Sequence, residues 1–258
     1  MIDRNRVLSE FRSYTADYDI SDDKIRLKVV HTYKVAENSE RIARSLSLCE
    51  EDTDLAWLIG MLHDIGRFEQ LRRFHTFIDR DSIDHAKFGA DLLFEEGLIR
   101  RFVEDTKYDG IIEAAIRAHN AYILEDDPDE RRLMFCKIIR DADKIDIFRV
   151  NDAFPKEVVY DTTKEILAKS PVTDEVVEAS LTHNTVHRNL KKTPADTIVG
   201  HLSLVYGIYY PESIRMLKEQ GYLQKLMETR NENEDTNSKL SKVCDEVRRY
   251  MDNFKNDL

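Results

Sequence analysis

The stretch Leu62-His63-Asp64-Ile65-Gly66-Arg67 is the most informative part of this chain. A histidine and an aspartate stand side by side at the end of an apolar helix predicted over residues 52–65, directly before a glycine. Burying two polar side chains there is costly unless a partner satisfies them, and a metal ion satisfies both. Most His-Asp dipeptides lie at a surface or cap a helix, so this pair predicts a metal site only together with other residues.

Other polar residues with metal-binding chemistry lie in predicted helices of apolar character. These residues are His31 in a helix over 23–48, His85 in one over 83–96, His119 in one over 109–123, and Asp141 and Asp143 in one over 129–149. A single histidine of this kind is more often a hydrogen-bonded core residue than a ligand. A set distributed over separate helices is what a metal site in the core of a helical bundle requires. Imidazole nitrogens and carboxylate oxygens suit Mn, Fe, Co, Ni or Zn without distinguishing among them.

The apolar spacing is helical along nearly the whole chain, and we therefore expect an all-α fold. Apolar residues recur every three to four positions, and no stretch alternates long enough to predict a sheet. The chain has only 8 Gly and 5 Pro, which are few turn-forming residues for 258 positions. Residues 67–82 are expected to form a loop with short helical turns. Further helices are expected at 156–168, 173–184, 194–207, 211–229 and 242–255, with a polar linker at 231–241.

The expected organisation is one main helical domain over residues 1–155. Residues 156–258 are expected to supply C-terminal helices that pack on this domain or extend it. His183 and His187 in this second part are spaced i, i+4, which is a spacing that permits a metal pair on a helix. Their polar, loop-like surroundings and the absence of a glutamate between them argue against such a pair.

The composition is that of a soluble globular protein with a heavily charged surface, since 41% of residues are hydrophobic and 34% are charged. The formal net charge of −11 argues against a general nucleic-acid-binding surface, which presents Lys and Arg to phosphates. Cys49, Cys136 and Cys244 have no CxxC spacing and are expected to be reduced thiols. The first residues lack an apolar signal core, and no stretch approaches the roughly 20 apolar residues that span a bilayer. We expect a cytoplasmic protein without membrane contact.

The motif residues together resemble the HD-domain metal-dependent phosphohydrolase superfamily. The resemblance covers about residues 25–150 and is carried by His31, by His63-Asp64 with the following Ile65-Gly66, and by Ala142-Asp143-Lys144. It implies an all-α helical bundle of the HD-domain type, here with additional C-terminal helices. It also implies a hydrolase of phosphoester or phosphoanhydride bonds in a small phosphorylated molecule, often a nucleotide. In such a site His31, His63, Asp64 and one later aspartate bind the first divalent metal ion.

Two aspartates compete for the position of the fourth ligand. Asp141 and Asp143 are about 200° apart around a helix, so both cannot point into one site. Asp143 is favoured because it precedes the basic residue Lys144, as the ligand usually does in this family. It also shares a helix face with Ile139 and Ile147. Asp141 stays open as the alternative.

A second metal ion is implied by two further histidines. His85 and His119 extend the resemblance to members with six ligand positions, in which two histidines hold a second ion and the aspartate of the His-Asp pair bridges. A carboxylate bridge between ions roughly 3.5–4 Å apart is a common hydrolytic design. The alternative is that His85 acts only as an acid or phosphate contact and that His119 only packs. The site is therefore expected to hold one or two divalent transition metal ions.

The metal chemistry implies attack on phosphorus by a metal-bound water, with Asp64 at the metal. Arg67, directly after the glycine, and Lys144, beside Asp143, are the candidate catalytic cations that bind the substrate phosphate. The alternative for both is an ion pair on a surface that carries many of the 39 basic and 50 acidic residues.

Two other functions share this set of ligands. The six-ligand order also resembles that of the HD-type di-iron oxygenases, which use the same ligands for chemistry with O₂. A non-catalytic sensor or scaffold, which keeps the metal and binds a partner through its C-terminal helices, is the third interpretation. The expected partner of the preferred function is a small phosphorylated substrate, and a homodimer is expected only as the commonest assembly.

Overall fold

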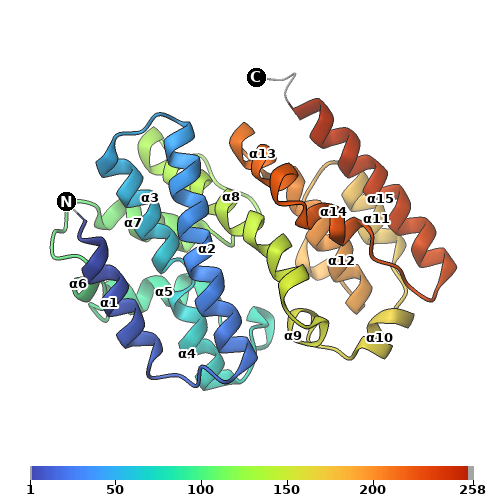
Figure 1. Ribbon diagram of the computed structural model, residues 1–258, viewed down its shortest axis with the longest axis horizontal. Helices are drawn as coiled ribbons and strands as arrows, with labels where there is room; N and C mark the ends of the chain where they lie inside the picture. Colours follow the sequence, from blue (N-terminus) through green and yellow to red (C-terminus); the bar gives the residue numbers. More distant parts are fainter. Residues whose placement is uncertain (1, 255–258) are drawn as a thin grey trace. The chain divides into compact units, whose positions relative to one another are not determined.

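The structure is a computed structural model that describes residues 2–254, drawn in Figure 1. Every regular element within these residues is a helix, and no strand occurs among them. The prediction of an all-α fold is confirmed. None of the helices in this described part of the chain is long and apolar enough to cross a membrane.

Contacts between residues divide the chain into two compact units, Met1–Asp143 and Lys144–Leu258. The division falls inside a single helix, α8 (Glu130–Ala153), which contributes residues to both units. The sequence instead predicts the division after this helix, at residue 155.

The first unit is built around two long neighbouring helices, α2 and α3, which lie side by side in Figure 1. Capping side chains fix several helix starts, for example Asp84, which accepts hydrogen bonds from the backbone of Ala86 and Lys87. The elements of this unit before α8 are α1 (Arg4–Thr15), α2 (Asp23–Ser45), α3 (Glu50–Leu62), α4 (Ile65–Phe74), η1 (Asp79–Asp81), α5 (His85–Phe94), α6 (Ile99–Phe102) and α7 (Asp109–Ala118).

The expected loop over residues 67–82 is wrong for its first part, because residues 67–74 belong to helix α4. The stretch is rich in charge but amphipathic, and Phe68 and Leu71 bury its apolar face. Glu69 forms ion pairs with Arg72 and Arg73 one turn later, which is a spacing that stabilises a helix.

Two glycines let the helices that carry the candidate ligands approach one another closely. A Cβ on Gly60 of α3 would lie 2.6 Å from the Cα of Ala36 in α2. A Cβ on Gly66 of α4 would lie 2.6 Å from the carbonyl oxygen of His85 and 2.8 Å from the backbone nitrogen of Gly89 in α5. Any side chain at either position would push the paired helices apart. The glycine after the His-Asp pair therefore serves to bring α4 against α5.

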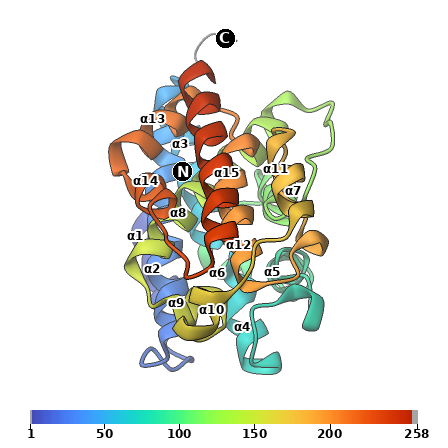
Figure 2. The same cartoon turned by 90° about the vertical axis from the view of Figure 1, so that its right-hand side faces the viewer.

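The second unit is also helical, and its last helix packs against α11, α12 and α14 (Figure 2). Its elements after α8 are α9 (Lys156–Tyr160), α10 (Lys164–Lys169), α11 (Asp174–Leu181), η2 (Arg188–Leu190), α12 (Pro194–Leu202), η3 (Ser203–Gly207), α13 (Pro211–Gln220), α14 (Tyr222–Met227) and α15 (Glu234–Asn253).

Three sequence predictions in this unit need correction. The helix expected over 156–168 is broken at Asp161, whose φ of 49° is left-handed, and the one over 211–229 is broken at Gly221, whose φ is 71°. The polar linker expected at 231–241 is mostly the first half of α15. Thr236 and Leu240 are buried one turn apart there, while the polar residues between them are partly or fully exposed.

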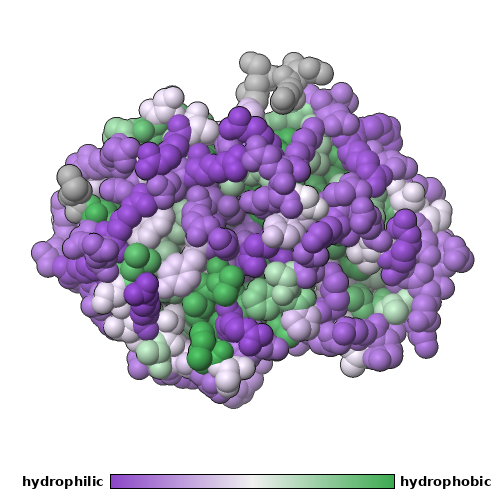
Figure 3. Space-filling model, viewed as in Figure 1, coloured by the Kyte–Doolittle hydropathy of each residue, from purple (hydrophilic) through white to green (hydrophobic). Residues whose placement is uncertain are grey.

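Figure 3 shows a face dominated by hydrophilic residues with smaller hydrophobic areas between them.

Candidate metal centre

Six residues that the sequence identifies as candidate ligands come together inside the first unit. They are His31 in α2, His63 and Asp64 between α3 and α4, His85 at the start of α5, His119 directly after α7, and Asp143 in α8. The exposed fraction is 5% or less for each of the four histidines and for Asp64. Polar side chains at this depth need partners that offset the loss of hydration.

One carboxylate oxygen of Asp64 faces His31 and His63. Asp64 Oδ2 lies 3.6 Å from the Nε2 atom of each histidine, and the two Nε2 atoms are 3.3 Å apart. Asp143 lies on the same side, with its Oδ1 3.1 Å from His31 Nε2 and 3.9 Å from His63 Nε2. The ligand atoms of His31, His63 and Asp64 are close enough together to hold one metal ion, and Asp143 lies beside the two histidines.

The other carboxylate oxygen of Asp64 faces the second pair of histidines. Asp64 Oδ1 lies 3.5 Å from His85 Nε2 and 3.7 Å from His119 Nε2, and these two nitrogens are 3.1 Å apart. Asp64 therefore stands between two groups of candidate ligand atoms and directs one oxygen at each. A carboxylate in this position suits a bridge between two metal ions.

In three of the histidines, the ring nitrogen that points away from Asp64 is Nδ1, and it donates a hydrogen bond to a neighbouring oxygen. His63 Nδ1 donates to the carbonyl of Gly60, and His119 Nδ1 donates to the carbonyl of Ile116, each at 2.7 Å. His85 Nδ1 donates to the carboxylate of Asp79, at 2.8 Å from Oδ2. A donor at Nδ1 leaves the lone pair at Nε2, and in all three rings Nε2 is the atom turned toward Asp64. The donor set therefore fits divalent transition metal ions.

Two cations flank Asp64, of which the sequence analysis identified one. Arg67 Nε lies 3.6 Å from Asp64 Oδ1, and this nitrogen is buried without a hydrogen-bond partner in the described part of the chain. Lys28, which the sequence analysis missed, places its ammonium 2.7 Å from Asp64 Oδ2. Both cations lie over the ring of Phe77, at 5.5 Å for Lys28 and 5.6 Å for Arg67. Lys28 is three residues before His31, so the helical repeat places both on one face of α2.

Asp79, which the sequence analysis also missed, connects His85 to Arg67. Its Oδ1 accepts a hydrogen bond from Arg67 at 3.0 Å and one from the Gln70 amide at 3.0 Å. The same carboxylate accepts the His85 Nδ1 hydrogen. Asp79 lies in the three-residue helix η1, inside a stretch without apolar periodicity, so no sequence pattern pointed to it.

A comparison with protein families identifies the domain to which this part of the chain belongs. Residues 29–147 match the family model of the HD domain. This stretch is an HD domain. HD domains define a superfamily of metal-dependent hydrolases, and the buried histidines and aspartates described above can hold a metal ion. Searches of curated proteins and of solved structures each found no match.

The remaining residues of the predicted site lie at the end of the HD domain, in α8. Asp143 is the aspartate beside His31 and His63, whereas Asp141 is fully buried in the same helix. The ammonium of Lys144 donates to the carbonyl of Gly207 and lies 5.5 Å from the ring centre of Tyr209, both in the second unit. A role of Lys144 in binding phosphate stays a prediction.

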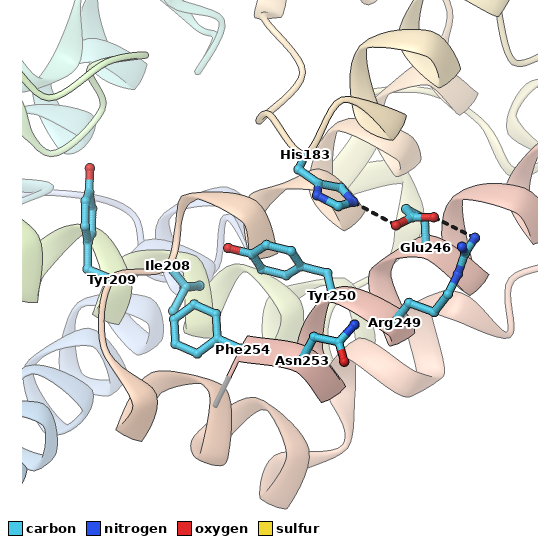
Figure 4. Close-up of a pocket in the computed structure, with 8 residues that line it drawn as sticks. All are labelled: His183, Ile208, Tyr209, Glu246, Arg249, Tyr250, Asn253 and Phe254. Carbon is cyan, nitrogen blue, oxygen red and sulfur yellow. Dashed lines mark hydrogen bonds and ion pairs between the residues drawn. The ribbon is translucent and has the colours of Figure 1, made fainter. Parts of the chain in front are cut away.

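The histidines outside the HD domain have other contacts. His183 Nε2 bonds to Glu246 at 2.7 Å and lines a pocket of about 540 Å³ in the second unit (Figure 4). His187 caps η2 by accepting a hydrogen bond from the backbone of Asn189. The other residues that line the pocket are Ile208, Tyr209, Glu246, Arg249, Tyr250, Asn253 and Phe254.

Burial and neighbouring charges control protonation in the HD domain. Burial lowers the pKa of His63 to about 3, and burial together with the nearby Arg67 cation lowers the pKa of His85 to about 4. Burial opposes ionisation of Asp64, but the Lys28 ammonium and the His63 ring hold the pKa of this carboxyl well below its usual range. Burial also opposes ionisation of Asp143, but the hydrogen bond to His31 and the electrostatic effect of His31 and His63 together lower the pKa of this carboxyl. These groups are thus neutral imidazoles and charged carboxylates near neutral pH, which are the forms that bind metal.

The metal-free protein is expected to lose stability as the pH falls from about 6.5 to about 4. The pKa values of His63 and His85 are lowered in the folded protein, so the unfolded chain binds more protons in this range. The free energy of unfolding should decrease by up to about 1.4 kcal/mol per histidine for each pH unit. The pKa values of Asp64 and Asp143 are lowered in the folded protein, so these carboxylates add to the loss only below about pH 5, where aspartates of the unfolded chain begin to bind protons. Urea unfolding of chelator-treated protein at several pH values measures this slope.

Two variants make the pH measurement specific. The substitution His63→Gln should reduce this slope by the contribution of one histidine, which is up to about 1.4 kcal/mol for each pH unit. The substitution His75→Asn is the control, since His75 is exposed and has a left-handed φ of 57° that asparagine tolerates. Equal unfolding free energies at pH 7 and pH 5 in the metal-free wild type would contradict the prediction.

Proposed function

We propose that this chain is a divalent-metal-dependent phosphohydrolase that cleaves a phosphoester or phosphoanhydride bond in a small phosphorylated molecule. The observation that supports the proposal most is the position of Asp64, whose two oxygens face two separate pairs of histidine nitrogens. Pairs of metal ions joined by a carboxylate are a common design for displacement at phosphorus. A nucleotide is the proposed substrate class, and this choice rests on the resemblance to the HD superfamily alone.

The proposed ligand sets follow the two sides of Asp64. His31, His63 and Asp143 would hold one ion, His85 and His119 would hold the other, and Asp64 would contact both. Divalent ions at such a site supply Lewis acidity and lower the pKa of water. The acceptors on the Nδ1 atoms keep His63, His85 and His119 oriented.

Lys28 and Arg67 are the proposed phosphate contacts of the first unit. Both cations lie beside Asp64 and are mostly buried, with 14% of each side chain exposed. The unpartnered Nε–H of Arg67 is a donor available to a phosphoryl oxygen. Charges held in place within a poorly hydrated site stabilise developing negative charge more strongly than mobile surface charges do. Arg67 is further fixed by hydrogen bonds to the Phe77 carbonyl and to Asp79.

A second candidate function is favoured by the same geometry. Two ligand groups joined by a carboxylate also suit a di-iron centre of the HD-type oxygenases, which the ligand order resembles. A metal-binding sensor or scaffold without turnover would need the same ligands. The metal itself and the reaction with substrate therefore decide among the three functions.

The test is metal analysis with electron paramagnetic resonance, joined to a phosphate-release assay on nucleotides and other phosphoesters. We expect up to two equivalents of divalent metal and metal-dependent phosphate release, both lost in the double variant His63→Ala, Asp64→Ala. The matched control is His75→Asn, Asp81→Ala, which removes an exposed histidine and an exposed aspartate from the same unit. A di-iron signal with oxygen consumption would favour the oxygenase, and bound metal without any turnover would favour the sensor. A metal-free wild type would contradict all three functions.

A further inference from the structure

Among residues 2–254, the basic side chains of Lys156, Lys191 and His201 in the second unit form no ion pair with a carboxylate, although the chain carries 50 acidic and 39 basic residues. The group lies around His201 in α12. Its other members are Asn151 near the end of α8, Lys156 and Tyr160 at the two ends of α9, and Lys191 directly after η2. These residues are separate in sequence from the candidate metal ligands, and none of them lies in the HD-domain match.

Asn151 forms hydrogen bonds to three other members of this group, Lys156, Tyr160 and His201. It is 1% exposed, and its backbone carbonyl accepts a hydrogen bond from the Lys156 ammonium at 2.6 Å. Its side-chain oxygen accepts the Tyr160 hydroxyl hydrogen. Its Nδ2 atom lies 2.8 Å from the carbonyl of Ile147 and 3.1 Å from His201 Nδ1. The ring centroids of Tyr160 and His201 lie 5.6 Å apart, so the side chains of Asn151, Tyr160 and His201 contact one another.

The hydrogen bonds of Asn151 favour one tautomer of His201. His201 Nδ1 lies 3.1 Å from Asn151 Nδ2 and 3.2 Å from Asn151 Oδ1, and Oδ1 already accepts the Tyr160 hydroxyl hydrogen. When Asn151 Nδ2 donates to His201 Nδ1, the imidazole proton lies on Nε2, for which residues 2–254 supply no hydrogen-bond partner. Burial and the ammonium groups of Lys191 and Lys156 lower the pKa of His201 to about 3, so the ring stays neutral. In this tautomer His201 offers an N–H donor.

Lys191 is the strongest sign that a ligand belongs here. Its stem packs on α12, since a Cβ on Gly200 would lie 2.9 Å from Lys191 Cδ. Its ammonium forms no hydrogen bond and no ion pair with any residue in the described part of the chain. The next residue, Lys192, is an instructive contrast, because it is exposed and pairs with Glu175 at 2.7 Å. Burial and the nearby Arg188 cation lower the pKa of Lys191.

The acidic residues nearest to these lysines are committed to other partners. Asp196 is fully buried and accepts hydrogen bonds from the backbone nitrogens of Thr173 and Lys192, each at 2.8 Å. Asp152, beside Lys156, pairs with Lys225 at 2.8 Å. Asp196 and Asp152 favour the charged forms of Lys191 and Lys156 only from a distance, because neither carboxylate forms an ion pair with these lysines. A half-buried cation without a direct partner is destabilising, and a bound anion would offset this cost.

We propose that Lys191, Lys156 and the Nε2–H of His201 form a binding site for a phosphate group, separate from the metal centre. Partly buried ammonium and imidazole N–H donors suit a tetrahedral oxyanion that accepts several charge-assisted hydrogen bonds. The phosphate would belong either to a free inorganic ion or to a small phosphorylated molecule.

The first test is calorimetric titration of inorganic phosphate into chelator-treated full-length protein, in which no metal ion is present to bind phosphate. We expect saturable binding in the wild type, and at least about a tenfold weaker affinity in Lys191→Gln. The matched control is Lys192→Gln, which removes the same charge from the neighbouring position and should bind as the wild type does. The proposal would be overturned if the wild type bound no phosphate, or if Lys191→Gln and Lys192→Gln lost phosphate affinity equally.

A second measurement keeps the test independent of any folding defect. In phosphate-free buffer, Lys191→Met removes an uncompensated charge, and we expect its unfolding temperature to rise by about 2–4 °C. Addition of phosphate should then stabilise the wild type and Lys192→Met but not Lys191→Met. Stabilisation of Lys191→Met by phosphate to the same extent as the wild type would overturn the site. A nucleoside monophosphate that binds more tightly than inorganic phosphate would identify an organic phosphate as the source, and equal binding would identify the free ion.

Discussion

Replacing Asp64 by asparagine is expected to remove both metal ions and to lower turnover of a phosphorylated substrate by about a thousandfold or more. Each carboxylate oxygen faces a different histidine pair, at 3.5–3.7 Å from the four Nε2 atoms. An amide has the same shape but no charge, and only one of its two terminal atoms can accept. The substitution therefore removes the bridge while it keeps the packing between α3 and α4.

Metal stoichiometry compared across aspartate variants shows whether Asp64 has this double role. Asp143 lies only on the side of His31 and His63, so Asp143→Asn should lose one metal ion and keep the one held by His85 and His119. Asp141→Asn should keep both ions, and loss of an ion there would instead make Asp141 the fourth ligand. Thermal unfolding of each variant excludes a folding defect. Retention of both ions in Asp64→Asn would contradict the bridging role.

The helical architecture and the six candidate ligands could be predicted because they depend on patterns local to the chain. Polar residues such as His31 and His119 interrupt apolar helical repeats, and such interruptions are visible without a structure. The structure brings these residues together in one unit, although the sequence alone contains no information about the distances between them. The two close approaches at Gly60 and Gly66 could not be predicted, because a glycine in a helix has several explanations.

The features that escaped prediction depend on tertiary contacts. Asp79 is one of many acidic residues in a polar stretch, and only its hydrogen bonds to His85 and Arg67 distinguish it. Lys28 could have been found from its position one turn before His31, but its pairing with Asp64 joins residues 36 positions apart. The helical start of α15 was missed for a different reason. Most residues at this helix start are polar, and its buried residues, Thr236 and Leu240, belong to a narrow stripe along one side of the helix.

Removing the carboxylate of Asp79 is expected to weaken one metal site selectively. In the variant Asp79→Ala, His85 Nδ1 loses its acceptor and Arg67 loses an ion pair. Loss of such a partner lowers metal affinity or activity by about 10- to 100-fold in comparable sites. The effect should fall on the ion held by His85 and His119. At the other ion, the orientation of His63 does not depend on Asp79, because its Nδ1 donates to the carbonyl of Gly60.

Titration of metal-free protein with Mn²⁺, followed by paramagnetic resonance, separates this positioning role from a general loss of structure. One equivalent should bind as tightly as in the wild type, and the other should bind about 10- to 100-fold more weakly. Asp79→Asn keeps an acceptor oxygen for His85 and should recover part of the affinity. Asp81→Ala, in the same short helix η1, removes an exposed carboxylate paired with Arg80 and serves as the control. Equal weakening of both equivalents in Asp79→Ala would mean that Asp79 supports the fold of the site as a whole rather than the orientation of His85.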